Sequence, residues 1–205
     1  MTLSPSRRQL GVDPDSTLVL SLGIMEPRKG QSVLARAWAR INRRYPNAQL
    51  ALVGATDSPY CNGVRRYVAA AGIANSCRLV PPTSDPWAWH AAADFFVLSS
   101  DIESAPVVLA EAMAFETPPV ATGVFGVAEL IRDRRDGFLC EPNDVVDLAR
   151  TLDGVLALDQ EQLRGIAVSA SRRAREHHDP DRFAARLGRL LEGLASDRER
   201  LPTWG

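Results

Sequence analysis

Short apolar runs alternate with longer amphipathic stretches along this chain. Six of the apolar runs have the length of strands, and a run such as TLVLSL has no polar face, which is typical of strands buried on both sides. The predicted strands cover residues 17–22, 49–53, 77–80, 94–99, 118–122 and 137–140. Helical periodicity predicts helices over residues 31–45, 63–71, 87–92, 106–115, a further helix from 144 and a last one from 179–180.

The last helix starts at Asp179-Pro180, with proline at its first position. The preceding His177-His178 doublet is expected to end the helix before it, where cationic side chains suit the carbonyl end. The last helix carries an apolar face at helical spacing, which we expect to pack on the core. That predicted core face consists of Phe183, Leu187, Leu190, Leu191 and Leu194.

Regular alternation of buried strands with helices predicts a parallel sheet covered on both faces. The expected fold is a doubly wound, Rossmann-like six-stranded α/β domain over residues 17–195, preceded by a linker or extension at 1–16 and followed by a tail at 196–205. Ligands of such sheets bind at the carboxyl ends of the strands, near the switch in strand order. The loops that follow the strands are therefore the places where a site is expected.

Composition narrows the function classes. The 205 residues are 45% hydrophobic and 24% charged, with a net charge of −1 and scattered basic residues, which argues against a nucleic-acid surface. No apolar run is long enough for a transmembrane span and no signal-peptide core is present, so a cytoplasmic location is expected. The cysteines Cys61, Cys77 and Cys140 lack metal or redox spacing and are expected to be buried, inert thiols.

The loop after the first strand joins a glycine, two cations and a helix start. It runs from Gly23 to Gly30 and contains Arg28 and Lys29. Backbone N–H groups at a helix start attract anions, and neighbouring cations strengthen the attraction, so a diphosphate is a natural ligand. Taken alone, the loop is better explained as a solvated surface turn, because Arg-Lys pairs are common. A Gly-x-Gly-x-x-Gly dinucleotide fingerprint is absent.

The loop after the fourth strand brings two glutamates toward the same edge. Glu103 lies before Pro106, which opens the next helix, and Glu111 lies about one and a half turns inside that helix. Carboxylates pair well with vicinal hydroxyls such as those of ribose or hexose. Two exposed, unrelated acids remain the alternative. The glycines of the loop after the fifth strand, Gly123 and Gly126, permit close backbone approach to a ligand.

Taken in order, these segments resemble the C-terminal domain of retaining GT-B glycosyltransferases, the group 1 or family 4 enzymes with two glutamates separated by seven residues. The resemblance runs from about Arg7 to Leu194. The segments that carry it are Gly23–Gly30, LALVG at 50–54, AAADFFVLSS at 91–100, Glu103 to Glu111 with EAMA at 111–114, PPVAT at 118–122 and GVAELIRDRRDGFLCEPND at 126–144.

The resemblance implies a hexose transfer from a UDP-, GDP- or ADP-sugar, with retention of configuration and with no metal or other cofactor. It implies that Lys29, with Arg28, clamps the diphosphate, that Glu103 faces the donor sugar and that Glu111 binds the ribose hydroxyls. Glu103, Lys29 and Arg28 would form the catalytic set. The implied donor-binding set is Gly23, Arg28, Lys29, Glu103, Ala105, Pro106, Val107 and Glu111. Contacts to the base are expected around Gly54 and residues 78–82.

The resembled enzymes also have an N-terminal domain that binds the acceptor and supplies a histidine. The sequence begins where their interdomain linker would begin, so this half is expected to be absent and the chain alone to be inactive. A missing half or partner chain could also bring the protein to the inner membrane face. None of His90, His177 and His178 stands in a matching motif, so none is assigned that role.

Four positions depart from the family pattern: Ile24, Glu116, Phe125 and Ala128. Glu116 and Phe125 replace common glycines, which leaves an altered donor site open. Two other functions are therefore kept. One is a non-catalytic module, derived from such an enzyme, that binds a nucleotide sugar or a partner. The other is an unrelated doubly wound protein such as a nucleotide-sugar epimerase, which the missing glycine fingerprint and the missing Tyr-x-x-x-Lys motif disfavour.

Overall fold

The computed structural model describes residues 7–198, which contain one six-stranded parallel sheet. The strand order β3-β2-β1-β4-β5-β6 reverses between β1 and β4, as in doubly wound nucleotide-binding folds. The predicted fold is confirmed, and the domain boundaries proposed for it stay a prediction. The strands are β1 (Thr17–Leu22), β2 (Ala48–Val53), β3 (Cys77–Val80), β4 (Phe95–Leu98), β5 (Pro119–Thr122) and β6 (Phe138–Cys140).

Helices follow the strands in the predicted order. The helix predicted over 63–71 begins earlier, because Ser58 accepts a hydrogen bond from the N–H of Cys61 and Pro59 opens the first turn. The helix predicted over 31–45 ends at Ile41 and continues as a 3-10 turn, Asn42–Arg44. The helices are α1 (Gln31–Ile41), α2 (Pro59–Ala70), α3 (Pro86–Ala92), α4 (Val107–Ala114), α5 (Gly126–Leu130), α6 (Val145–Leu156), α7 (Gln160–His178) and α8 (Pro180–Arg198).

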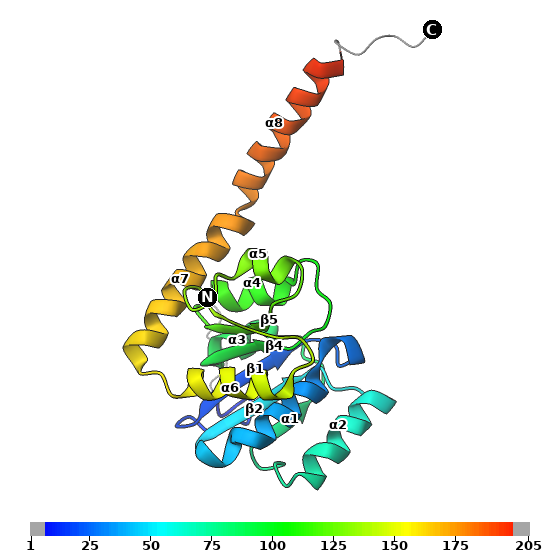
Figure 1. Cartoon of the computed structure of the whole chain (residues 1–205), viewed down its shortest axis with the longest axis vertical. Helices are drawn as coiled ribbons and strands as arrows, with labels where there is room; N and C mark the ends of the chain where they lie inside the picture. Colours follow the sequence, from blue (N-terminus) through cyan, green and yellow to red (C-terminus); the bar gives the residue numbers. More distant parts are fainter. Residues whose placement is uncertain (1–6, 199–205) are drawn as a thin grey trace.

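The sheet is covered on both faces, which explains its mainly apolar strands (Figure 1). Helices α1, α2 and α6 pack on one face together with side chains such as Val19. Helices α3, α4, α5 and α7 pack on the other face, with Leu18 and Leu20. Successive residues of β1 thus enter opposite cores, as the alternation of side chains along a strand requires. Both faces are closed, and the carboxyl ends of the strands remain for ligands.

Helix α8 extends beyond the body of the domain (Figure 1). The prediction that its apolar face packs on the core is wrong: Phe183 is 66% exposed and Leu190 is 59% exposed. Helical periodicity identifies an apolar face, but burial also needs a facing surface, and α8 points away from the sheet. Of the described helices, none has an apolar stretch that would cross a bilayer. Of the tail predicted at residues 196–205, residues 196–198 belong to α8, and residues 199–205 lie outside the described part of the chain.

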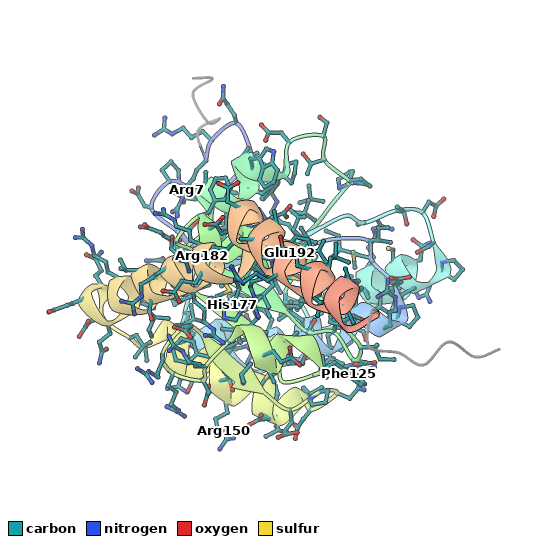
Figure 2. The ribbon with its side chains drawn as sticks, turned by 90° about the horizontal axis from the view of Figure 1, so that it is seen from above. Arg7, Phe125, Arg150, His177, Arg182 and Glu192 are labelled. Carbon is teal, nitrogen blue, oxygen red and sulfur yellow. The ribbon has the colours of Figure 1, made fainter. Side chains whose placement is uncertain are left out.

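The predicted position of the histidine doublet and the predicted burial of the cysteines are confirmed, and the inertness of Cys61 stays a prediction. His177 and His178 form the last turn of α7, directly before α8 begins, and His177 lies at this junction in Figure 2. The three cysteines are free and buried. Burial raises the pKa of the Cys77 and Cys140 thiols to about 12, so neither supplies a thiolate at neutral pH.

Helix α4 ends in a left-handed turn at Glu116, where the resembled enzymes commonly have glycine. The φ angle of Glu116 is 58°. The N–H of Glu116 donates to the carbonyl of Met113, and the N–H of Thr117 donates to that of Ala112. These two bonds form a Schellman motif, which favours glycine at the left-handed position. Glu116 therefore retains backbone strain at the end of a helix that carries candidate site residues.

Glu116→Gly is expected to stabilise the domain by about 1 kcal/mol, because glycine adopts the left-handed conformation without a Cβ penalty. The measurement is the melting temperature and the urea midpoint, which should both rise. Glu116→Ala is the matched control, since it removes the carboxylate and keeps the strain. Equal stability of the glycine and alanine variants would contradict the strain at this position.

Candidate functional site

The loop after β1 and the loop after β4 meet at the switch in strand order. Residues 27–29 form a 3-10 turn that ends at Gly30, whose φ angle is 67°. A Cβ on Gly30 would lie 1.8 Å from the carbonyl oxygen of Ser99, so only glycine permits this approach. The N–H of Asp101 donates to the carbonyl of Arg28 (2.8 Å), and the Ser99 hydroxyl donates to that of Lys29 (3.1 Å). The two loops are thus joined by their backbones.

Lys29 and Glu103 form the central contact between these loops. The Lys29 ammonium donates to Oε1 of Glu103 at 2.5 Å, and the Ser100 hydroxyl donates to the same oxygen at 2.8 Å. The Glu103 side chain is only 8% exposed and that of Lys29 is 20% exposed. Since both donors contact Oε1, the lone pairs of Oε2 are left for another partner. The arrangement holds a cation and a carboxylate side by side at the carboxyl ends of β1 and β4.

Arg28 lies on the same turn and is more open to solvent. Its guanidinium pairs with Glu26 at 2.6 Å, and its side chain is 53% exposed. An exposed pair of this kind contributes little to stability, because water screens it. Arg28 can therefore leave Glu26 for an anionic ligand at small cost, whereas Lys29 is held by a buried carboxylate.

Helix α4 begins at the same edge of the sheet, and its first turn has no side-chain cap. Its N-cap residue is Pro106, and no side chain accepts a hydrogen bond from its first turn. The first N–H groups of a helix need acceptors, and they carry the positive end of the helix dipole. The N–H of Val107 thus presents partial positive charge to the cavity that Lys29 also lines, whereas Ala105 and Pro106 contribute backbone contacts and Pro106 has no N–H. An anion is the complementary ligand.

Glu111 comes from the same helix, and its side chain is 26% exposed. Partial burial raises the pKa of its carboxyl above the ordinary value. Beneath it lies His90, a fully buried residue of α3, whose Nε2 is 3.8 Å from Oε2 of Glu111. A carboxylate at this depth can accept hydrogen bonds from ligand hydroxyls while its backbone stays rigid in the helix.

All eight residues that the resemblance implies for donor binding line one cavity of about 420 Å³. The structure therefore brings them together, and their binding roles stay predictions. A larger cavity of about 630 Å³ lies at the β6 edge, where Arg134 and Arg150 line it together with Asp133 and Asp147. Its charges largely offset one another, and it lies away from the switch in strand order. The smaller cavity is thus the better candidate on chemical grounds.

The predicted base-binding region does not line this cavity. Neither Gly54 nor residues 78–82 are among the lining residues, and the Arg78 guanidinium donates to the carbonyls of Leu10 and Gly11 instead. Phe125 lies on the loop before α5, 70% exposed, with a φ angle of 39° (Figure 2). A bulky residue with positive φ is strained, which agrees with a position where glycine is common. No described residue assigns the base.

Three residues of the site were missed by sequence reasoning. Ser100 precedes Glu103 by three positions, and a serine at the end of a strand carries no distinctive signal. Gln31 is buried at the first turn of α1 and lines the cavity, where its Oε1 has no partner among the described residues. His90 was left unassigned because a lone histidine in a helix has no distinctive spacing. Within residues 7–198, no group of acids, histidines and cysteines could hold a metal ion.

Comparison with known proteins places this geometry in a family. The family model of the group 1 glycosyl transferases matches residues 4–174. A GDP-mannose-dependent alpha-(1-6)-phosphatidylinositol monomannoside mannosyltransferase of Mycolicibacterium smegmatis is 31% identical over 90% of this chain and 50% of its own length. A D-inositol 3-phosphate glycosyltransferase of Thermomonospora curvata is 33% identical over 91% of this chain and 44% of its own length. The chain thus spans about half the length of these relatives.

Solved structures agree with the sequence relatives. Anabaena HepE in complex with UDP and glucose has a TM-score of 0.82 and is 26% identical, over 91% of this chain and 51% of HepE. The sucrose-phosphate synthase of Thermosynechococcus elongatus has a TM-score of 0.80 and is 27% identical, over 93% of this chain and 48% of that chain. The sheet order, the loops joined at the switch point and the family match lead to one conclusion: this chain belongs to the group 1 glycosyltransferases.

Proposed function

We propose that this chain is the donor-binding domain of a retaining glycosyltransferase, which transfers a hexose from a nucleoside-diphosphate sugar to an acceptor. The observation that carries the proposal is the Lys29–Glu103 pair at the ends of β1 and β4, with Glu111 in the same cavity. A cation beside an uncapped helix start suits a diphosphate, and two carboxylates suit the hydroxyls on either side of it.

In this proposal the diphosphate binds between Lys29, Arg28 and the first turn of α4. As the glycosidic bond breaks, negative charge grows on the leaving diphosphate, and the fixed cation and helix dipole stabilise it. Oε2 of Glu103 accepts a hydrogen bond from a hydroxyl of the donor sugar, while Lys29 and Ser100 donate hydrogen bonds to Oε1. No metal is needed, because the positive charge comes from Arg28, Lys29 and the helix start.

The acceptor is proposed to bind on a further domain or partner chain, consistent with relatives about twice as long as the matched region. This domain alone would then bind the donor without turning it over. A non-catalytic binding module is the second candidate, favoured by the strained, exposed Phe125 on the loop before α5. Turnover of a nucleotide sugar, measured with a separately supplied acceptor-binding half, distinguishes the enzyme from the module.

The proposal is tested by isothermal titration calorimetry of this chain with UDP, GDP and ADP. UDP and GDP are suggested by the UDP-bound HepE and by the GDP-mannose-dependent relative. Saturable binding of at least one of the three, in the presence of EDTA, is expected. If none binds at millimolar concentration, the cavity is not a working donor site.

Glu111→Ala is expected to weaken the binding of the best-binding nucleoside diphosphate by about ten- to a hundredfold, because hydrogen bonds from the ribose to a carboxylate are lost. The 2′,3′-dideoxy form of the same nucleotide should bind wild type and variant equally, which calorimetry can measure. Glu161→Ala removes an exposed glutamate of α7 outside the cavity and should change neither affinity. An equal loss for both nucleotides would contradict the ribose contact.

A further inference from the structure

His90 is a buried residue that lies directly behind the candidate ribose-binding carboxylate. Its ring packs between Phe96, with centroids 5.5 Å apart, and Phe115, with centroids 5.7 Å apart. The hydroxyl of Thr117 donates to the His90 carbonyl at 3.2 Å. The aromatic contacts fix the plane of the imidazole, and the Thr117 bond fixes its backbone, so the nitrogens of His90 have a defined direction.

Neither ring nitrogen of His90 has a hydrogen-bond partner among the described residues, although the residue is only 1% exposed. Burying a polar group without a partner is unfavourable, and a phenylalanine would fill an aromatic stack without that penalty. One polar atom is close, since Oε2 of Glu111 lies 3.8 Å from Nε2. The imidazole thus faces Glu111, a side chain that lines the cavity.

We infer that His90 is a positioning residue for Glu111: its Nε2–H donates to the carboxylate and holds it where both hydroxyls of a nucleotide ribose can reach it. This inference rests on the proposed function, because it assigns to Glu111 a ribose as its ligand. It adds a second layer to the site that neither the sequence motifs nor the cavity lining contains.

The separation of 3.8 Å is longer than a hydrogen bond, but it closes with a small rotation of the Glu111 carboxylate, whose terminal torsion is soft. Burial lowers the pKa of His90 to about 4, so the ring is neutral at neutral pH and carries one N–H donor. A neutral donor orients the carboxylate and leaves its negative charge for the ribose hydroxyls. A protonated histidine would neutralise that charge and weaken the carboxylate as an acceptor.

The test compares the nucleoside diphosphate that binds best, among UDP, GDP and ADP, with its 2′,3′-dideoxy form by calorimetry. His90→Phe, which keeps the aromatic stack and removes the N–H, should bind the ribose form about tenfold more weakly and the dideoxy form as wild type does. Its melting temperature should not fall, because an unpaired buried polar group is removed. His90→Gln, which retains a donor near the position of Nε2, should recover most of the lost affinity. His90→Leu carries the same prediction as His90→Phe if phenylalanine does not fit.

Trp87→Leu is the matched packing control, since Trp87 also stacks on Phe115, with ring centroids 5.8 Å apart, and is not among the residues that line the cavity. It should leave both affinities unchanged. If His90 acts through Glu111, replacing it should not change nucleotide affinity further once Glu111 is alanine. The double variant His90→Phe with Glu111→Ala should therefore bind the nucleotide as weakly as Glu111→Ala alone.

The inference and the proposed function fail in different ways. If Glu111→Ala loses the preference for ribose while His90→Phe retains it, the inference is overturned and the proposed function stands. If the glutamine variant binds as weakly as the phenylalanine variant, a positioning hydrogen bond is also excluded. If wild type prefers the ribose form no more than the dideoxy form, the ribose role of Glu111 itself is overturned.

Discussion

Lys29→Ala is expected to weaken the binding of a nucleoside diphosphate by about a hundredfold. The variant loses charge-assisted hydrogen bonds from the ammonium to the phosphates. It also leaves Glu103, which is 8% exposed, without its cation at 2.5 Å. An unpaired carboxylate beside a diphosphate repels it, so the two effects act in the same direction.

The same variant should lose about 1 kcal/mol of folding free energy. Removing one partner of a fully buried ion pair costs several times more, but Lys29 is 20% exposed and water moderates the loss. Calorimetry measures the affinity, and urea unfolding measures the stability.

The double variant Lys29→Met with Glu103→Gln separates the two losses. It has no buried unpaired charge, so its stability should return to that of wild type, while its nucleotide affinity stays low. If the double variant recovered nucleotide binding, Lys29 would be a structural partner of Glu103 and would not clamp the phosphates. Lys29→Ala alone could not make this distinction.

Glu103→Gln is expected to act in the opposite direction on the bare nucleotide. Without the carboxylate, Lys29 turns its full charge to the phosphates, so the nucleoside diphosphate should bind as tightly as to wild type or severalfold more tightly. The intact nucleotide sugar should lose the additional affinity that its sugar provides, because the acceptor for a sugar hydroxyl is replaced. The measurement is the ratio of the dissociation constants for nucleotide and nucleotide sugar.

Ser100→Ala is the matched control for Glu103→Gln. It removes the second hydrogen bond to Oε1 and retains the negative charge, so it should leave the bare nucleotide affinity close to that of wild type. A marked loss of bare nucleotide affinity in Glu103→Gln would contradict the division of roles between Glu103 and Glu111.

The fold was predictable because hydrophobic burial leaves a periodic pattern of apolar residues in each strand and helix. Strands without a polar face, such as β1, require helices on both sides, and alternation with helices then limits the topology to a doubly wound sheet. The positions of Lys29 and Glu103 at strand ends followed from the same pattern. Their direct contact did not, because it joins residues 74 positions apart and depends on β1 lying next to β4.

Two features could not be predicted because their partners are not readable from a single sequence. The periodicity of α8 correctly indicates an amphipathic helix, but Phe183 and Leu190 are exposed, since periodicity carries no information on the facing surface. His90 gains its position from three-dimensional packing between Phe96 and Phe115. By contrast, the sequence comparison identified Glu116 as a replacement for a common glycine, and its φ angle of 58° explains why glycine is favoured there.

We propose that a nucleotide sugar binds where the β1 and β4 loops meet. The most direct test is a map of backbone amide shifts in the NMR spectrum of this chain during titration with UDP, GDP and ADP. The proposed site predicts that the largest shifts occur at residues 23–31 and 100–111. Shifts concentrated instead around Arg134 and Arg150, at the larger cavity of the β6 edge, would contradict it.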